Sequence, residues 1–228
     1  MKLFIEKEEV NIPDKELDDL YLGEGSESTV YLHKKEALKI YKDNFYQKRL
    51  TEEESMKMKR ILTQRIMLPR RIIYDKNKEF IGYTTPFKKE ADLDFLNRIT
   101  MEKFIEELKI LQEDVRILSH EGIKLEDIHQ NNLLISDGIY LCDPGLYRFT
   151  NMEYEGLYRE NIIELNYLFT VLLIETSVFK LTNEQKDALE DYFGVSSRFF
   201  LDKLVEEQNI NPNQQVKSFI RNLALSVI

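Results

Sequence analysis

The sequence is poor in the residues that staple small folds together. Its single cysteine, Cys142, excludes an internal disulfide framework and any zinc site built from several cysteines. Its three histidines show no metal-ligand spacing such as His-Glu-x-x-His. Eight glycines and five prolines leave no obvious flexible linker, and neither internal repeats nor low-complexity segments occur. A chain of 228 residues can bury roughly 70% of its unfolded surface, so a hydrophobic core can stabilise the fold without disulfides or metal ions.

Long apolar runs and an excess of positive charge are also missing. The most apolar stretch, Tyr167–Ile174, is far shorter than the roughly 20 residues that span a bilayer. Met1–Val10 carries three glutamates and lacks the apolar stretch of a signal peptide. The net charge of −9 argues against non-specific binding to nucleic acid. We therefore expect a cytoplasmic monomer with a reduced thiol and with neither nucleic acid nor membrane as a partner.

What is present is typical of a globular α+β protein. Apolar residues make up 43% of the chain, and 12 Tyr with 13 Phe exclude the disordered class. The first part of the chain, up to about residue 90, has strand patterns and one helical pattern. We expect strands at Leu20–Leu22, Thr29–His33, Ala37–Tyr41, Ile72–Tyr74 and Phe80–Thr84, and a helix at about 47–63.

The rest of the chain is mostly helical. Apolar residues recur every three or four positions over Phe104–Leu118 and predict one long amphipathic helix. Asp137-Gly138 lies between two apolar runs and predicts a hairpin that pairs Leu133–Ser136 with Ile139–Cys142. Further helices are expected at about 160–176, 183–193, 197–207 and 212–226, with a capping pattern Thr182-x-x-Gln185 at the start of 183–193.

Between the first two expected strands, the chain reads Gly23-Glu24-Gly25-Ser26. Two glycines separated by one residue allow backbone N–H groups to approach phosphate oxygens, because no Cβ is in the way. A tight hairpin turn explains the same residues equally well. No helix follows directly and no Gly-Lys-Ser/Thr occurs, so neither the dinucleotide-binding fingerprint nor the P-loop fits.

Lys39 lies inside the apolar strand Ala37–Tyr41. A buried lysine is costly unless its ammonium meets an anion, although an edge strand with Lys39 facing water is the alternative. Glu54 is the preferred partner in the following helix, because Met58 and Leu62 lie four and eight residues further on and place it on the apolar side. An acidic first turn at a helix N-terminus is the other interpretation of Glu54.

A third group of polar residues follows the long helix. Asp127, Asn132 and Asp143 lie in loops on either side of the expected hairpin. Their oxygens are the ligands that Mg²⁺ prefers, with substrate phosphates completing the shell. One of the two aspartates can instead accept a hydrogen bond from an attacking hydroxyl. Each residue alone could cap a loop, but together they predict a site.

These motifs, in this order, resemble the protein kinase superfamily over about Leu20 to Thr176. Gly23–Val30 looks like the Gly-rich loop and Ala37-Leu38-Lys39 like the strand-three lysine motif. The sequence Gly82-Tyr83-Thr84-Thr85-Pro86-Phe87 resembles the end of strand five and the hinge, with Thr85 at the gatekeeper position. The run Ser119 to Asp127 resembles the approach to the catalytic loop, and Asp143-Pro144-Gly145 the Asp-Phe-Gly metal motif.

The resemblance implies a bilobal α+β fold with ATP and Mg²⁺ in the cleft. A small, mainly antiparallel lobe with one helix would cover about residues 1–86, a hinge 86–88, and a mostly helical lobe about 89–228. The activation segment and the C-terminal region would be short. Both lobes would belong to a single domain.

The family also implies a role for each matching residue. Lys39 would hold the α- and β-phosphates and pair with Glu54, and Asp127 would orient or deprotonate the acceptor hydroxyl. Asn132 and Asp143 would hold Mg²⁺. The nucleotide would contact Leu22, Gly23, Gly25, Ser26, Val30, Ala37, Lys39, Thr85, Pro86, Phe87, Lys88 and Leu134.

Several departures from the family pattern shape the expected activity. Ser28 replaces the third glycine, Leu125-Glu126 stands before Asp127 in place of His-Arg, and Pro144 replaces phenylalanine. His129 makes the catalytic loop similar to that of aminoglycoside and choline kinases. We expect an atypical, minimal Ser/Thr protein kinase. The alternatives are a small-molecule kinase and a nucleotide-binding pseudokinase scaffold.

Overall fold

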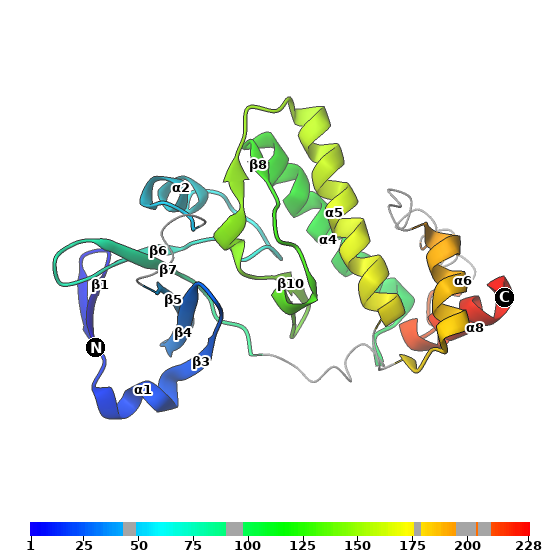
Figure 1. The fold of residues 1–228 in the computed structure, drawn as a ribbon, viewed down its shortest axis with the longest axis horizontal. Coiled ribbons are helices and arrows are strands. Elements are labelled where there is room, and N and C mark those ends of the chain that lie inside the picture. The colour runs from blue at the N-terminus through cyan, green and yellow to red at the C-terminus, as the bar shows by residue number, and fades with distance from the viewer. Residues whose placement is uncertain (43–48, 90–97, 176–178, 195–203, 205–210) are drawn as a thin grey trace.

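A computed structural model describes residues 1–42, 49–89, 98–175, 179–194, 204 and 211–228. Within these residues the protein is a mixed α+β structure, built on a seven-stranded antiparallel sheet with the order β2-β1-β6-β7-β5-β4-β3. The strands are β1 Lys2–Ile5, β2 Glu8–Asn11, β3 Tyr21–Glu24, β4 Ser28–His33, β5 Glu36–Tyr41, β6 Arg71–Tyr74 and β7 Phe80–Pro86. The sheet and the helices nearest to it lie at one end of the molecule (Figure 1).

The five expected strands of this region are confirmed, but the first three elements of the chain, β1, β2 and α1 (Asp14–Leu20), were not predicted. The hairpin β1–β2 adds two strands to the sheet through the pairing of β1 with β6. Leu3, Ile5 and Val10 are buried in a small second core, which explains why such short strands form. The helix α1 then leads directly into β3.

The expected helix over about 47–63 is shorter in the structure, and residues 43–48 lie outside the described part of the chain. Helix α2 spans Glu52–Met58 and begins at Thr51, which forms a capping box with Glu54. After Met58 the chain leaves the helix and contacts α4 (Met101–His120) at residues 64–66. The Asp114 carboxylate accepts hydrogen bonds from the backbone N–H groups of residues 64–66 at 2.5–2.9 Å.

The remaining helices form the other part of the molecule. They are α4 Met101–His120, α5 Tyr154–Glu175, α6 Asn183–Phe193 and α8 Val216–Val227. The amphipathic pattern over Phe104–Leu118 is confirmed, since its apolar residues are fully buried against the core. The capping box of Thr182 and Gln185 is also confirmed. Most of the helix expected at 197–207 lies outside the described residues.

Short elements lie between the sheet and the long helices α4 and α5 (Figure 1). They include the expected hairpin, β9 Leu133–Ile135 with β10 Ile139–Leu141, and a second pair, β8 Ile123–Lys124 with β11 Arg148–Phe149. Two 3₁₀ turns, η1 Gln130–Asn132 and η2 Pro144–Leu146, flank the hairpin. None of the helices in the described ranges combines the length and apolar character needed to cross a membrane.

Candidate functional site

A cavity of about 720 Å³ separates the sheet from the β9–β10 hairpin. This volume is in the range of small-molecule and cofactor sites. Leu22, Val30 and Ala37 line it from the sheet, and Leu134 lines it from the hairpin. The segment at the end of β7 contributes Thr85, Pro86, Phe87 and Lys88, and the polar end is formed by Lys39, Asn132 and Asp143.

A second cavity of about 460 Å³ continues from the polar end of the first. The two share Val30, Asn131, Asn132 and Asp143 among their lining residues. The second one adds Gly25, Ser26 and Glu27 from the turn between β3 and β4, and Asp127 with His129 from the loop before η1. Of the residues expected to bind the nucleotide or the metal or to act in catalysis, all except Gly23 and Glu54 therefore line one of these two cavities.

Lys39 is buried at the polar end of the larger cavity. Its strand β5 lies between β4 and β7, so the alternative of an edge strand is excluded. Its ammonium forms an ion pair with the Asp143 carboxylate. Tyr83, directly opposite Lys39 in β7, places its ring centroid 6.0 Å from the ammonium and lines the same cavity. The burial of this lysine is thus compensated by an anion.

The expected ion pair between Lys39 and Glu54 is wrong for this structure. The Glu54 carboxylate accepts hydrogen bonds from the backbone N–H and the hydroxyl of Thr51, both at 2.9 Å. The Thr51 hydroxyl in turn accepts from the Glu54 N–H at 3.2 Å. Glu54 therefore stabilises the N-terminus of α2, which is the alternative that the acidic first turn left open, and Asp143 takes its place beside Lys39.

The two aspartates of the site have unusual backbone conformations. Asp127 and Asp143 have φ angles of 59° and 60°, in the left-handed region that few non-glycine residues adopt. Asp143 is held there by Pro144 after it and by the Gly145 N–H, which its carboxylate accepts at 3.3 Å. Such conformations persist where the surrounding structure holds them and are common at functional sites.

Hydrogen bonds orient the loop that carries Asp127. The Asn132 side chain donates through Nδ2 to the Asp127 backbone carbonyl at 2.8 Å, which leaves its Oδ1 available to a ligand. His129 Nε2 lies 3.5 Å from the Asp127 carboxylate. Asp127 and Asp143 both keep roughly half of their side-chain surface exposed, so both carboxylates can reach a ligand in the cavity.

Glu27 is an acidic residue of the site that the motifs did not single out. A Cβ built on Gly145 would lie 3.0 Å from Lys39 Nζ, 3.1 Å from Asp143 Oδ1 and 3.4 Å from Glu27 Oε2. Partial burial raises the pKa of Glu27 above its usual value; Lys39 opposes this shift, and the Asp143 and Asp127 carboxylates add to it. The feature of the sequence that could have indicated Glu27 as a site residue is its position directly after the glycine turn Gly23–Ser26.

Lys88 lines the larger cavity, and its ammonium forms an ion pair with Asp137. The ammonium lies 2.9 Å from both carboxylate oxygens of Asp137, in the turn of the β9–β10 hairpin. Contacts with the Tyr140 hydroxyl and with Asp137 raise the pKa of Lys88. A ligand in this part of the cavity would therefore contact the backbone and the aliphatic part of the Lys88 side chain. The ion pair between the Lys88 ammonium and Asp137 connects the segment after β7 to the hairpin.

The donor set at the polar end fits a magnesium ion that arrives with a phosphate ligand. Asn132 and Asp143 offer oxygen atoms, the ligand type that Mg²⁺ requires. In the described part of the chain, no three His, Cys, Asp or Glu side chains are placed to hold a metal together. A cation with only two protein ligands would need water and phosphate oxygens to complete its shell, which is how Mg²⁺ is usually bound.

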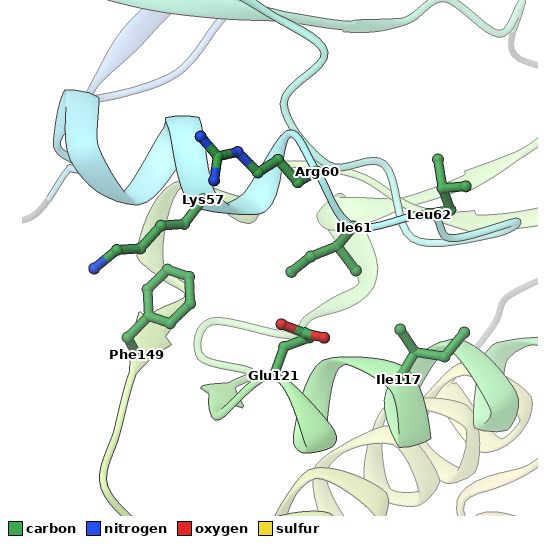
Figure 2. A pocket seen from close by; sticks show the side chains of 7 residues that line it. All are labelled: Lys57, Arg60, Ile61, Leu62, Ile117, Glu121 and Phe149. Atoms are coloured by element: carbon green, nitrogen blue, oxygen red, sulfur yellow. The ribbon is translucent and has the colours of Figure 1, made fainter.

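Besides a cavity against α6 and the end of α8, two further cavities lie outside these two. One, of about 450 Å³, borders the site: it shares His129 and Asn131 with it and is closed by Tyr167 and Val171 of α5. The other, of about 530 Å³, lies between the end of α2 and the end of α4, where the Phe149 ring lies beside the Lys57 side chain and the Glu121 carboxylate points toward Ile61 (Figure 2). None of the residues expected in the site lines this second cavity.

No protein-family model matches the chain, and a search of curated proteins finds no match. Any functional conclusion therefore rests on the residues of the cavity.

Proposed function

We propose that the chain is an ATP- and Mg²⁺-dependent phosphotransferase with a bilobal protein-kinase-like fold. Residues of about 1–86 and 89–228 form its lobes, and 86–88 the hinge. It moves the γ-phosphate of ATP to a hydroxyl, most favourably that of a Ser or Thr in a protein. One observation carries the proposal: the residues expected to bind the nucleotide or the metal or to act in catalysis, drawn from distant parts of the sequence, line two joined cavities, with the exceptions of Gly23 and Glu54.

The two cavities suit the two ends of a nucleotide. The larger one has apolar walls, with Leu22, Val30 and Ala37 on the sheet side and Leu134 on the other, and a planar base is stabilised by such walls. Its polar end leads to Lys39, whose positive charge suits phosphate oxygens. The glycine turn covers the smaller cavity with backbone N–H groups that can approach phosphates.

Each polar side chain then has one task in the transfer. Asn132 and Asp143 hold the magnesium ion, which neutralises charge on the phosphates when it is bound. Asp127 accepts a hydrogen bond from the acceptor hydroxyl and receives its proton. His129 and the Asn132 amide hold the Asp127 loop in position. The catalytic gain comes from positioning and charge stabilisation, with no covalent intermediate on the protein.

A small-molecule acceptor is the second candidate, and one observation favours it. The cavity lined by His129, Tyr167 and Val171 has about 450 Å³ of space, and it shares His129 and Asn131 with the cavity that Asp127 lines. Tyr167 keeps 44% of its surface exposed there, although its chain neighbours Asn166 and Leu168 on α5 are buried. A compact alcohol could occupy this space with its hydroxyl directed to Asp127.

The first test is a melting shift. Mg·ATP at a hundred times its Kd adds about 2.7 kcal/mol of stability. This corresponds to a rise of roughly 5–10 °C in Tm for a chain of this size. The Asp143→Ala variant should lose the shift. Asp187→Ala, which removes an exposed carboxylate from α6, should keep it. Equal shifts in both variants would contradict the assignment of Asp143.

The second test separates the acceptors. Incubation with γ-labelled ATP and Mg²⁺ should label the protein itself or a generic protein substrate, and Asp127→Asn should not transfer label. ADP release that depends on an added alcohol, without protein labelling, would select the small-molecule candidate. Nucleotide binding without any transfer would leave a nucleotide-binding scaffold, and would contradict the proposed activity.

A further inference from the structure

A carboxylate without a partner faces the phosphate end of the site. The turn between β3 and β4 is held by backbone bonds from Gly25 N–H to the Ser28 carbonyl and from Lys42 N–H to the Glu27 carbonyl, both 2.9 Å long. Glu24, the last residue of β3, is paired with Lys42 at 3.2 Å. The Glu27 side chain, in contrast, makes no hydrogen bond or ion pair with any residue in the described ranges.

Glu27 lies where negative charge is already concentrated. Glu27, Asp127 and Asp143 line the same cavity, and a Cβ built on Gly145 would lie 3.4 Å from Glu27 Oε2 and 3.1 Å from Asp143 Oδ1. Arg148, a positive charge that also acts on Glu27, does not line this cavity and donates to the Gly145 carbonyl at 3.2 Å. The Lys39 ammonium is already paired with Asp143. A phosphate chain that enters this cavity alone therefore meets three carboxylates and a lysine whose charge is largely compensated. Like charges at such distances in a partly desolvated cleft repel strongly.

We propose that Glu27 makes nucleotide binding conditional on a divalent cation. It repels the free triphosphate and admits the metal complex, because the cation cancels part of the phosphate charge beside it. Asp127 and Asp143 have tasks in the transfer itself, and Lys42 neutralises Glu24. Glu27 is thus the acidic residue of the cavity whose charge remains for this selection. The inference rests on the proposed nucleotide-binding function of the same cavity.

The experiment measures Kd by calorimetry for ATP with excess EDTA and for ATP with excess Mg²⁺, at constant ionic strength. In wild type, Mg·ATP should bind and free ATP should bind much more weakly. Glu27→Gln should tighten binding of free ATP by roughly tenfold. The same variant should leave the Kd of Mg·ATP within about twofold, because the cation already offsets the carboxylate. The effect on free ATP should shrink as salt is added.

Two controls isolate the charge at position 27. Glu24→Gln changes the same residue type at the end of β3 and lines the same cavity, but removes a carboxylate that Lys42 already compensates. It should leave both Kd values within about twofold, since an exposed ion pair has little net effect. Adenosine, which has no phosphate, should bind wild type and Glu27→Gln equally.

The other outcomes contradict the inference in distinct ways. Equal affinity of wild type for free ATP and Mg·ATP, or unchanged binding of free ATP by Glu27→Gln, would overturn it and leave the proposed nucleotide site intact. Equal tightening of both forms would show a general repulsion without metal selection. Weaker binding of Mg·ATP by Glu27→Gln would make the carboxylate a ligand of the complex. Binding of neither form by wild type would overturn the inference and the proposed function together.

Discussion

Two sets of acidic side chains in this fold differ in their burial and in the number of hydrogen-bond donors around them. Asp114 and Glu107 on α4 are fully buried, and their oxygens are saturated with donors. Asp114 accepts the backbone N–H groups of residues 64–66. Glu107 binds the Arg65 guanidinium at 2.5 and 3.0 Å, the Lys103 ammonium at 3.2 Å and a backbone N–H. These carboxylates join the loop after α2 to the helices.

Asp127, Asp143 and Glu27 around the cavity are half-buried and have few donors. Two of the three sit on backbone of positive φ. A buried charge that stabilises the fold must be satisfied from within, whereas charges left short of partners in a cleft mark a place for a ligand. The contrast predicts that substitutions in the first set change stability and that substitutions in the second set change function.

The largest expected effect is on function. Asp127→Asn keeps the size of the side chain and removes its basicity, so phosphate transfer should fall by roughly 10²–10⁴-fold. The free energy of unfolding should change by less than about 0.5 kcal/mol, since the side chain is half exposed. Initial rates with labelled ATP and urea unfolding measure the two quantities. A stable, fully active variant would remove Asp127 from the catalytic role.

Next in size is a loss of stability at Asp114. Asp114→Ala leaves three backbone N–H groups of the segment 64–66 without their acceptor and should cost about 3 kcal/mol. Asp114→Asn keeps one acceptor oxygen and should lower the free energy of unfolding by less. Urea unfolding measures both. The Kd for Mg·ATP of the folded protein should stay within about twofold, because Asp114 lies outside the cavity. A stability within 1 kcal/mol of wild type would break the comparison.

The same contrast explains which parts of the fold and the site could be predicted from the sequence. The residues alone predicted a site from Asp127, Asn132 and Asp143, because the Asp-Gly hairpin between the loops is a local signal. That Lys39 belongs to the same site was implied only by the resemblance to protein kinases. The β1–β2 hairpin escaped prediction because four-residue strands have almost no periodicity. Its stability comes from burying Leu3 and Ile5 against the sheet, a contact between distant residues.

Partners of charged residues were the least predictable feature. Glu54 has the correct helical spacing to face the sheet, yet Thr51 three residues earlier offers a nearer partner. Asp114 and Glu107 look in the sequence like ordinary polar positions of an amphipathic helix, and only the folded chain shows that they are buried. Helical periodicity predicts a face, but the tertiary fold decides which donor reaches each carboxylate.

A smaller and pH-dependent effect is expected at Glu107. Burial alone would raise the pKa of this carboxyl, but Arg65, the Ile139 N–H and Lys103 outweigh it and hold the pKa below its usual value. A lowered pKa in the folded state adds stability above the unfolded pKa, and this contribution is lost as the pH falls through the folded pKa. Glu107→Gln should therefore cost about 2 kcal/mol near pH 7, with a gap to wild type that narrows in acid. Unfolding free energies across this range measure it, and a constant gap would contradict the account.

The smallest expected effect decides to which set Glu54 belongs. In this structure its carboxylate caps α2, so Glu54→Ala should cost about 1 kcal/mol of stability. Glu54→Gln can accept the same hydrogen bonds and should resemble wild type in urea unfolding. Neither variant should change the Mg·ATP melting shift or the rate of transfer, because Asp143 is the partner of Lys39. The informative result is the opposite one for Glu54→Gln. A normal stability with a large loss of transfer would mean that α2 turns to bring Glu54 to Lys39 during the reaction, and Glu54 would then join Asp127 and Asp143 among the functional carboxylates.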